Sequence, residues 1–96
     1  MNKEYIAALQ DAIRHTHGCK SRHVETVAVT EGFKGKIAWR GEVEVFDLIG
    51  HPQARQGYAW GFKDDAGRWQ YDAVLKTPPV DSPLKAVQAY IVAQHK

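Results

Sequence analysis

The chain has 96 residues, of which 44% are hydrophobic and 25% charged, and this composition predicts one globular domain over 1–96 and excludes a disordered or fibrous protein. The formal net charge of +2 is smaller than the basic excess of a dedicated nucleic-acid binder. A single cysteine, Cys19, cannot form an internal disulfide, and no run approaches the length of a membrane span. The N-terminus has no apolar leader, so we expect a cytoplasmic protein without a membrane partner.

The first predicted element is a helix between Asn2 and Gly18. Asn2 is a residue type that caps helix N-termini, and Gly18 stands where a left-handed residue ends a helix. Apolar residues recur between them at helical spacing: Tyr5, Ile6, Leu9, Ala12 and Ile13. The stripe predicts a helix that packs one face on the rest of the domain, with Cys19 folded back on Ile13.

Four strand candidates follow, at 23–29, 36–48, 56–62 and 68–76. The second alternates most plainly, and its polar positions Arg40, Glu42 and Glu44 predict one solvent-exposed face. The last two carry aromatic residues at every other position: Tyr58, Trp60 and Phe62, then Trp69 and Tyr71. The sequence Asp-Asp-Ala-Gly (64–67) between them predicts a hairpin turn. We expect the aromatic face, which also carries Trp39, to be core and not a stacking platform for bases.

The last predicted element is a helix that begins at Ser82, an N-cap residue, with Pro83 at its first position. Hairpin-length links between the strands favour an antiparallel meander, and the two apolar helix stripes need a surface to cover. We therefore predict the order α-β-β-β-β-α, an α+β fold in which a four-stranded antiparallel sheet carries both helices on one face as a two-layer sandwich.

Histidine and cysteine residues cluster near the end of the first helix: His15, His17, Cys19 and His23. Two helical residues two positions apart point about 200° away from each other, so His15 and His17 cannot share one metal ion. The spacing matches no common zinc motif. We therefore predict no metal and no other cofactor.

Basic residues in the first half of the chain suggest a second type of site. Arg14, Lys20, Arg22, Lys34 and Lys36 are candidates for contact with phosphates, with Arg40 near them in sequence. Nucleic-acid binding is therefore an alternative function. A solvated helix end explains the same residues, and four glutamates interrupt the positive field: Glu25, Glu31, Glu42 and Glu44.

Small residues alternate on the third strand and predict a contact surface. Glycine at alternate positions of a strand often marks the close approach of another segment. Gly57, Ala59 and Gly61, together with Phe46 and Val74, are therefore candidates for the interface of a homodimer or for another protein partner.

The segment Gly50-His51-Pro52 lies between the second and third strands. Gly50 tolerates a positive φ and Pro52 disfavours helix before it, so the tripeptide suits a turn and needs no chemistry. The imidazole of His51 is nevertheless a candidate general base. Cys19 and His23 are the other candidate catalytic residues, and the question is whether either lies beside His51 in space.

A longer motif, Trp-x-Gly-x-Val-Glu-Val-Phe-Asp-Leu-x-Gly-His-Pro-x-Ala (39–54), is preceded by His-Gly-Cys and His-Val-Glu-Thr-Val and followed by Tyr-Ala-Trp. This combination resembles a family of small bacterial hypothetical proteins of unknown function, over most of the chain. The resemblance implies a bacterial source but no activity and no residue roles. The element order is also similar to that of double-stranded RNA-binding domains, although this chain has an extra strand and lacks their lysine motif. Our leading hypothesis is a non-enzymatic binding or self-association module, with RNA binding and a small enzyme or ligand site around His51 as alternatives.

Overall fold

The computed structural model describes residues 3–94. They form α1 (Lys3–His17), β1 (Lys20–Phe33), β2 (Lys36–Ile49), β3 (Gln56–Lys63), β4 (Trp69–Leu75) and α2 (Pro83–Gln94). The predicted α+β class, element order and four-stranded antiparallel sheet are confirmed. Asn2, the predicted cap of the first helix, lies outside the described residues. No helix in this part of the chain is long and apolar enough to span a membrane.

The helix ends follow the predicted local signals. Gly18 has a φ of +70°, and its N–H donates to the carbonyl of Arg14 at 2.8 Å, which closes the last turn of α1. At the start of α2, the hydroxyl of Ser82 accepts a hydrogen bond from the N–H of Lys85 at 3.2 Å. Both boundaries are therefore set by single residues that the sequence identifies.

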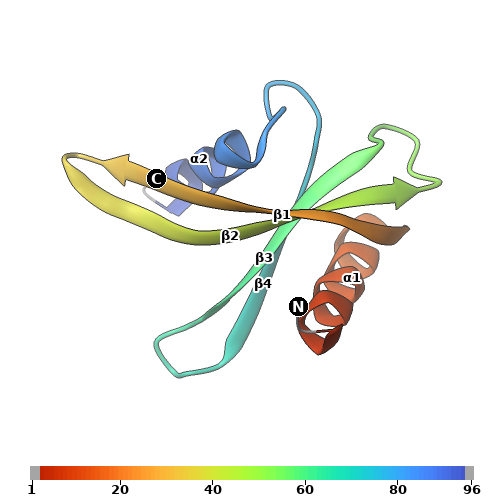
Figure 1. Ribbon diagram of the computed structural model, residues 1–96, viewed down its shortest axis with the longest axis horizontal. Helices are drawn as coiled ribbons and strands as arrows, with labels where there is room; N and C mark the ends of the chain where they lie inside the picture. The colour runs from red at the N-terminus through yellow and green to blue at the C-terminus, as the bar shows by residue number, and fades with distance from the viewer. Residues whose placement is uncertain (1–2, 95–96) are drawn as a thin grey trace.

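The sheet consists of two hairpins joined side by side, in the order β1-β2-β3-β4. The β1–β2 turn needs two residues with positive φ, Lys34 and Gly35, as a two-residue hairpin turn requires. The two hairpins pair only where residues 44–47 meet residues 56–59. Beyond that short region they diverge, and Figure 1 shows them crossing near the centre of the molecule with their tips pointing in different directions.

One face of the sheet packs against α2 and holds the aromatic core. Trp60 is 1% exposed and makes edge contacts with Trp39 and Tyr90, with ring centroids 5.7 and 5.6 Å apart. Val87 of α2 is fully buried against the same cluster. The prediction that these strand aromatics are core is confirmed for Trp39, Tyr58, Trp60 and Phe62, which are buried or half-buried.

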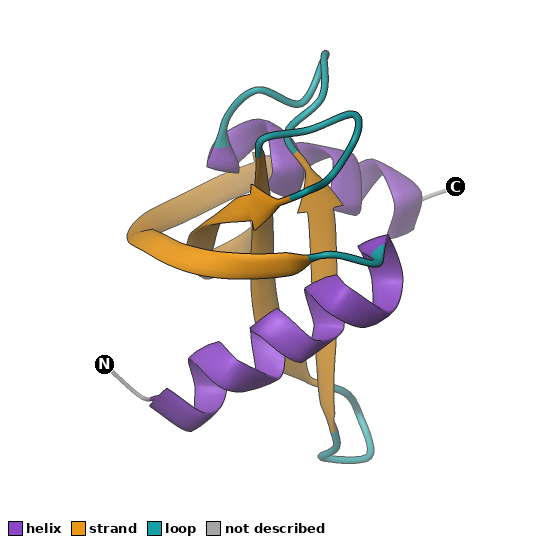
Figure 2. Ribbon diagram, turned by 90° about the vertical axis from the view of Figure 1, so that its right-hand side faces the viewer, coloured by secondary structure: helices purple, strands orange, loops and turns teal. Residues whose placement is uncertain are grey.

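The other face packs against α1, so the helices lie on opposite faces of the sheet (Figure 2). Leu9 and Ile13 of α1 are buried against Phe46 and Ala59, which alternate along their strands with residues of the α2 cluster. The arrangement is helix, sheet, helix, and the expected placement of both helices on one side is corrected. Because β2 is covered on both faces, Glu44 is only 4% exposed, where the alternating pattern predicts a solvent-exposed glutamate.

The position of β4 also differs from the expected one, by a single residue. The link between β3 and β4 has five residues, 64–68, and pairs Lys63 with Trp69 and Gly61 with Tyr71. The four-residue turn read from the sequence pairs Phe62 with Trp69 instead. A register shift of one residue moves every side chain of a strand to the other face. Trp69 and Tyr71 therefore lie on the α1 face, 51% and 38% exposed, apart from the aromatic core.

Candidate functional site

A row of polar side chains crosses all four strands at one end of the sheet, on the α2 face. Arg22 of β1 donates to Asp47 of β2 at 2.6 Å, and the Gln56 amide of β3 donates to the same carboxylate at 3.0 Å. Lys76, directly after β4, reaches the Gln56 side-chain oxygen at 3.5 Å. The hydrogen bonds from Arg22 and then Gln56 hold the pKa of Asp47 below its usual value. The row is therefore a connected network with a charged residue at each end.

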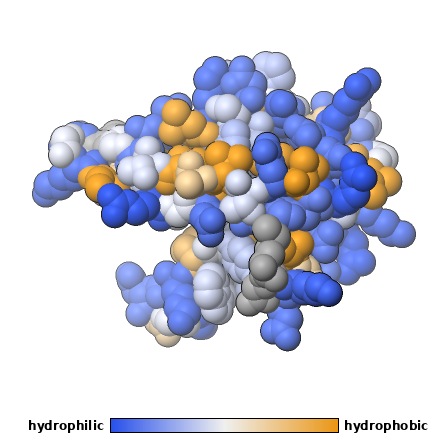
Figure 3. Space-filling model, viewed as in Figure 1, coloured by the Kyte–Doolittle hydropathy of each residue, from blue (hydrophilic) through white to orange (hydrophobic). Residues whose placement is uncertain are grey.

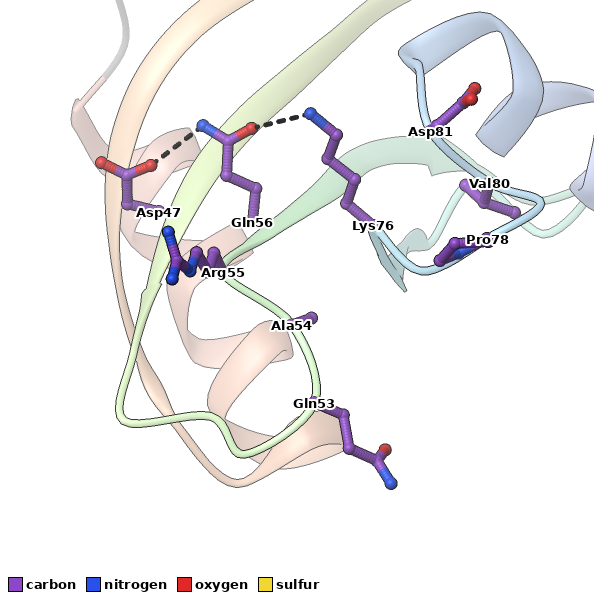
Figure 4. A pocket seen from close by; sticks show the side chains of 9 residues that line it. All are labelled: Asp47, Gln53, Ala54, Arg55, Gln56, Lys76, Pro78, Val80 and Asp81. Carbon is purple, nitrogen blue, oxygen red and sulfur yellow. Dashed lines mark hydrogen bonds between the residues drawn. The ribbon is translucent and has the colours of Figure 1, made fainter.

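A pocket of about 570 Å³ adjoins this row, between the β2–β3 loop and the segment that leads into α2 (Figure 4). Ala54, Pro78 and Val80 supply apolar lining. Polar and charged residues complete it: Asp47, Gln53, Arg55, Gln56, Lys76 and Asp81. A pocket with apolar walls and a few convergent polar groups is the usual form of a small-molecule site.

The charges around the pocket do not balance. Its two carboxylates already have cationic partners, since Asp47 pairs with Arg22 and Asp81 with Lys85 at 3.2 Å. Arg55 and Lys76 form no ion pair with any carboxylate in residues 3–94. The pocket thus has two cations without a counter-charge, which is the feature that an anionic ligand recognises.

His51 organises the loop that carries Arg55. Its Nδ1 atom accepts hydrogen bonds from the backbone N–H groups of Gln53 at 3.0 Å and Ala54 at 3.1 Å. Gly50 has a φ of +80°, as predicted, and the N–H of Leu48 donates to the carbonyl of Arg55 at 2.8 Å, which closes the loop. The imidazole therefore acts as a turn cap. Its Nδ1 atom is three bonds from Cα, like the side-chain oxygen of Asp or Asn, and accepts from the following N–H groups in the same way.

Within residues 3–94, His51 shares no hydrogen bond or ring contact with Cys19 or His23. The ring of His17 in α1 lies against the His51 ring, with centroids 6.4 Å apart at 81°. His17 itself donates from Nε2 to the carbonyl of Ala73 at 2.9 Å. The Nδ1 atom of His51 is thus engaged by two backbone N–H groups, and its ring contact is with His17.

The two other candidate catalytic residues lie under α1. Cys19 is 8% exposed and packs with Leu9 and Ile13, as expected for a structural thiol. His23 donates from Nε2 to the carboxylate of Glu44 at 2.8 Å, and the same carboxylate accepts a hydrogen bond from Thr26. A bulge at Val24 brings His23 to this face, because it shifts the pairing of β1 with β2 by one residue. Glu44 is thus a buried acid that has its partners.

The candidate phosphate contacts do not form one patch. Lys34 and Lys36 lie at the tip of the β1–β2 hairpin, whereas Lys20 and Arg22 lie at the opposite end of the 14-residue strand β1. Arg14 pairs with Asp11 at 3.1 Å, and Arg22 pairs with Asp47. The structure therefore divides the predicted basic surface and neutralises part of it.

The predicted interface is occupied by the chain itself. Phe46 and Ala59 are fully buried under α1, and the N–H of Gly61 donates to the Tyr5 hydroxyl at 2.7 Å. A Cβ at Gly61 would lie 2.9 Å from the Tyr5 ring. Gly61 thus marks a close approach of α1, whereas Gly57 lies against the Leu48 side chain and the Val74 backbone. Val74 lies on the α2 face because of the shifted register, so these residues do not share one surface.

Metal ligation finds no further support. No group of three His, Cys, Asp or Glu side chains within 3–94 is arranged to hold an ion.

Two residues of the pocket, Arg55 and Lys76, were not among the candidates from the sequence. They are single charges at strand ends, 21 residues apart, and no spacing rule connects them. The sequence signal that could have identified them is their position beside a turn. Arg55 follows Gly50-His51-Pro52, and Lys76 precedes Pro78-Pro79. The antiparallel pairing of β3 with β4 places both residues in the lining of one pocket.

Apolar side chains are also exposed at several places outside the pocket, among them Val24 and Ile49 on the β1–β2 hairpin and Trp69 on β4. Figure 3 shows apolar residues along the middle of one side of the molecule, surrounded by hydrophilic ones.

Comparisons with protein-family models, with curated proteins and with solved structures find no match for this chain.

Proposed function

We propose that the protein is a non-enzymatic binding module, and that its ligand is a small organic anion bound in the pocket between the β2–β3 loop and the segment before α2. The observation that carries this proposal is a pair of cations, Arg55 and Lys76, that have no carboxylate partner among residues 3–94. They lie beside the apolar surface of Ala54, Pro78 and Val80. A carboxylate or phosphate group would accept hydrogen bonds from both cations. An apolar body on the same ligand would cover the three apolar residues.

The His51 cap supports the proposal because it fixes the backbone that presents Arg55. A site gains affinity when its groups are held in place before the ligand arrives. In this hypothesis His51 is a positioning residue, and its imidazole need not touch the ligand.

The test is an NMR titration with benzoate, which combines a carboxylate with an apolar ring. We expect shifts of the backbone amides in residues 53–56 and 76–81, and no such shifts with benzamide, the neutral analogue. Replacing both cations, Arg55→Gln with Lys76→Gln, should remove the benzoate shifts. Arg40→Gln is the matched control, since Arg40 is exposed on the β1–β2 hairpin and lies outside the pocket lining.

Two results would overturn the proposal. Benzoate could leave the amides of the pocket unchanged at concentrations of tens of millimolar, roughly the weakest binding that such a titration detects. Alternatively, the double variant could respond to benzoate as the unmodified protein does, in which case the two cations do not hold the anion.

The proposal also includes a setting and a partner. A cytoplasmic, bacterial setting remains part of the hypothesis, and the motif in residues 39–54 is what suggests the bacterial source. Self-association as a homodimer remains part of the hypothesis, on a surface other than the one first expected. RNA binding at the end of α1 is the weaker alternative, because Arg14 and Arg22 are already paired. It predicts an electrophoretic shift that fades steeply as salt is raised.

A further inference from the structure

The outer edge of β4 carries backbone groups that the sheet does not use. Asp64 donates its N–H to the carbonyl of Arg68, and Lys76 donates its N–H to the carbonyl of Gln56, both at 2.9 Å. Hydrogen-bonded pairs in an antiparallel ladder recur every second residue, so Gln70, Asp72 and Val74 bond to β3. The N–H and C=O groups of Trp69, Tyr71 and Ala73 therefore point away from the sheet.

One of these outward groups confirms the direction. The carbonyl of Ala73 accepts the hydrogen bond from His17 of α1, which requires that it faces away from β3. Within residues 3–94, the outward groups of Trp69 and Tyr71 and the N–H of Ala73 have no hydrogen-bond partner. An edge with a row of open donors and acceptors is a template for another strand.

The side chains beside this edge complement each other by size. Trp69 is 51% exposed and is the largest apolar side chain on the described surface. A groove of about 490 Å³ runs between α1 and β4, lined by Ala8, Ala12, His15, Thr16 and Tyr71 among others. The small residues Ala8 and Ala12 leave the space, and Gln70 and Tyr71 in its lining place the groove beside the strand that carries the indole.

We propose that β4 pairs antiparallel with β4 of a second copy, about a two-fold axis at Tyr71. A two-fold contact uses the same patch on both copies, so the patch must be self-complementary. In this register Trp69 lies opposite Ala73 of the other copy on the α1 face, a large side chain opposite a small one, and enters the groove beside Ala12 and Thr16.

The opposite face of the paired strands is also compatible. Gln70 lies across from Asp72 of the other copy, so no two like charges face each other. Tyr71 pairs with its own counterpart through two backbone hydrogen bonds. The Trp69–Ala73 pair adds one bond, from the N–H of Ala73 to the carbonyl of the opposite Trp69, because the Ala73 carbonyl already accepts from His17. The product is a continuous eight-stranded sheet. This pairing assigns a surface to the self-association that is part of the proposed function, and it rests on that part alone. The proposed anion pocket is separate, since it lies beyond the end of β4.

The test combines sedimentation with hydrogen exchange on the full chain. Between about 10 μM and about 1 mM the unmodified protein should pass from monomer to dimer. Trp69→Lys, which places a charge at the edge, should weaken dimerisation at least about tenfold. Ile37→Lys is the matched control, since Ile37 is 59% exposed on the other hairpin, and it should dimerise normally.

Hydrogen exchange identifies the edge directly and also reports on folding. The amides of Tyr71 and Ala73 should be protected only at high protein concentration, whereas those of Gln70, Asp72 and Val74 should be protected at every concentration and in Trp69→Lys. A strict monomer up to about 1 mM would end the self-association hypothesis as a whole. A dimer that Trp69→Lys leaves intact, or in which the Tyr71 amide exchanges as fast as in the monomer, would exclude this surface alone. Neither result bears on benzoate binding.

Discussion

The Nδ1 atom of His51 lies 3.1 Å from the backbone nitrogen of Ala54 and accepts its hydrogen bond, while it also accepts one from Gln53. An aromatic side chain here performs a task that short polar side chains usually perform in turns. Ala54 is 7% exposed, so its N–H has little access to water as a substitute acceptor. The contact thus links a loop conformation to the lining of the pocket that we propose binds an anion.

Replacing this acceptor should loosen the loop. We expect His51→Ala to lower the free energy of unfolding by roughly 1 kcal/mol, because two N–H groups lose their acceptor and one of them is buried. His51→Asn should restore most of that loss, since its side-chain oxygen occupies a position similar to that of Nδ1. Urea unfolding of the three proteins measures the difference. Equal stability of the Ala and Asn variants would show that the cap has no energetic role.

The contact of Gly61 with Tyr5 gives a second prediction. In Gly61→Ala the new methyl group would lie 2.9 Å from the Tyr5 ring and 3.1 Å from the Tyr71 ring. Tyr5 is held in place by its hydrogen bond to the Gly61 N–H, so α1 has to shift. We expect a loss of about 1 to 3 kcal/mol in the free energy of unfolding.

Gly32→Ala is the control for that substitution. Its methyl group would lie 3.4 Å from the carbonyl oxygen of Lys36 and would meet no other atom within 4 Å. Its effect should stay within about 0.5 kcal/mol, as for most exposed positions. If both variants unfold at the same urea concentration as the unmodified protein, the packing of α1 on the glycine row contributes less than the contact distances indicate.

Local signals in the sequence were sufficient for the elements and their order. Gly18 and Ser82 end and begin the helices as predicted, and the alternating segments form the strands. Such features depend on a residue and its near neighbours, so their physics is contained in a short stretch of sequence.

These local signals did not show which face of the sheet each side chain lies on, because a single extra residue in a loop or strand moves side chains to the other face. One additional residue in the 64–68 loop places Trp69 and Tyr71 opposite the aromatic core, and the bulge at Val24 moves His23 to the α1 face. Once β4 is placed correctly, Trp69 becomes an exposed residue at an edge. The glycines of β3 predicted a close contact but could not tell which segment approaches: at Gly61 it is α1 and not a second molecule.

The buried glutamate provides a third prediction. Glu44 accepts hydrogen bonds from His23 and Thr26 beneath α1. Glu44→Ala would leave both donors half-buried without a partner, so we expect a loss of about 1 to 3 kcal/mol in the free energy of unfolding. Glu42→Ala, two residues earlier at an exposed position of the same strand face, should change it by less than about 0.5 kcal/mol. Chemical denaturation compares them, and equal values would refute a structural role for the Glu44 network.

Asp72 differs from Glu44, because one of its carboxylate oxygens is buried without a hydrogen-bond partner in the described structure. Burial raises the pKa of Asp72 above its usual value. In the pH range between the unfolded and the folded pKa, the folded protein therefore binds more protons than the unfolded chain. Stability must fall as pH rises through this range, which is the reverse of the behaviour of Asp47, whose pKa is lowered.

Asp72→Asn should therefore stabilise the protein at pH 7, by roughly 1 kcal/mol, because it removes a desolvated charge. The gain should shrink as pH is lowered towards the unfolded pKa, where the carboxyl of the unmodified protein is protonated in both states. Urea midpoints measured from pH 7 down to about pH 3.5 give the difference between the two proteins, in which the titration of all other groups cancels. Asp65→Asn in the exposed β3–β4 loop controls for the change in net charge. A gain that stays constant over this range, or a loss at neutral pH, would mean that the Asp72 charge is not the destabilising feature.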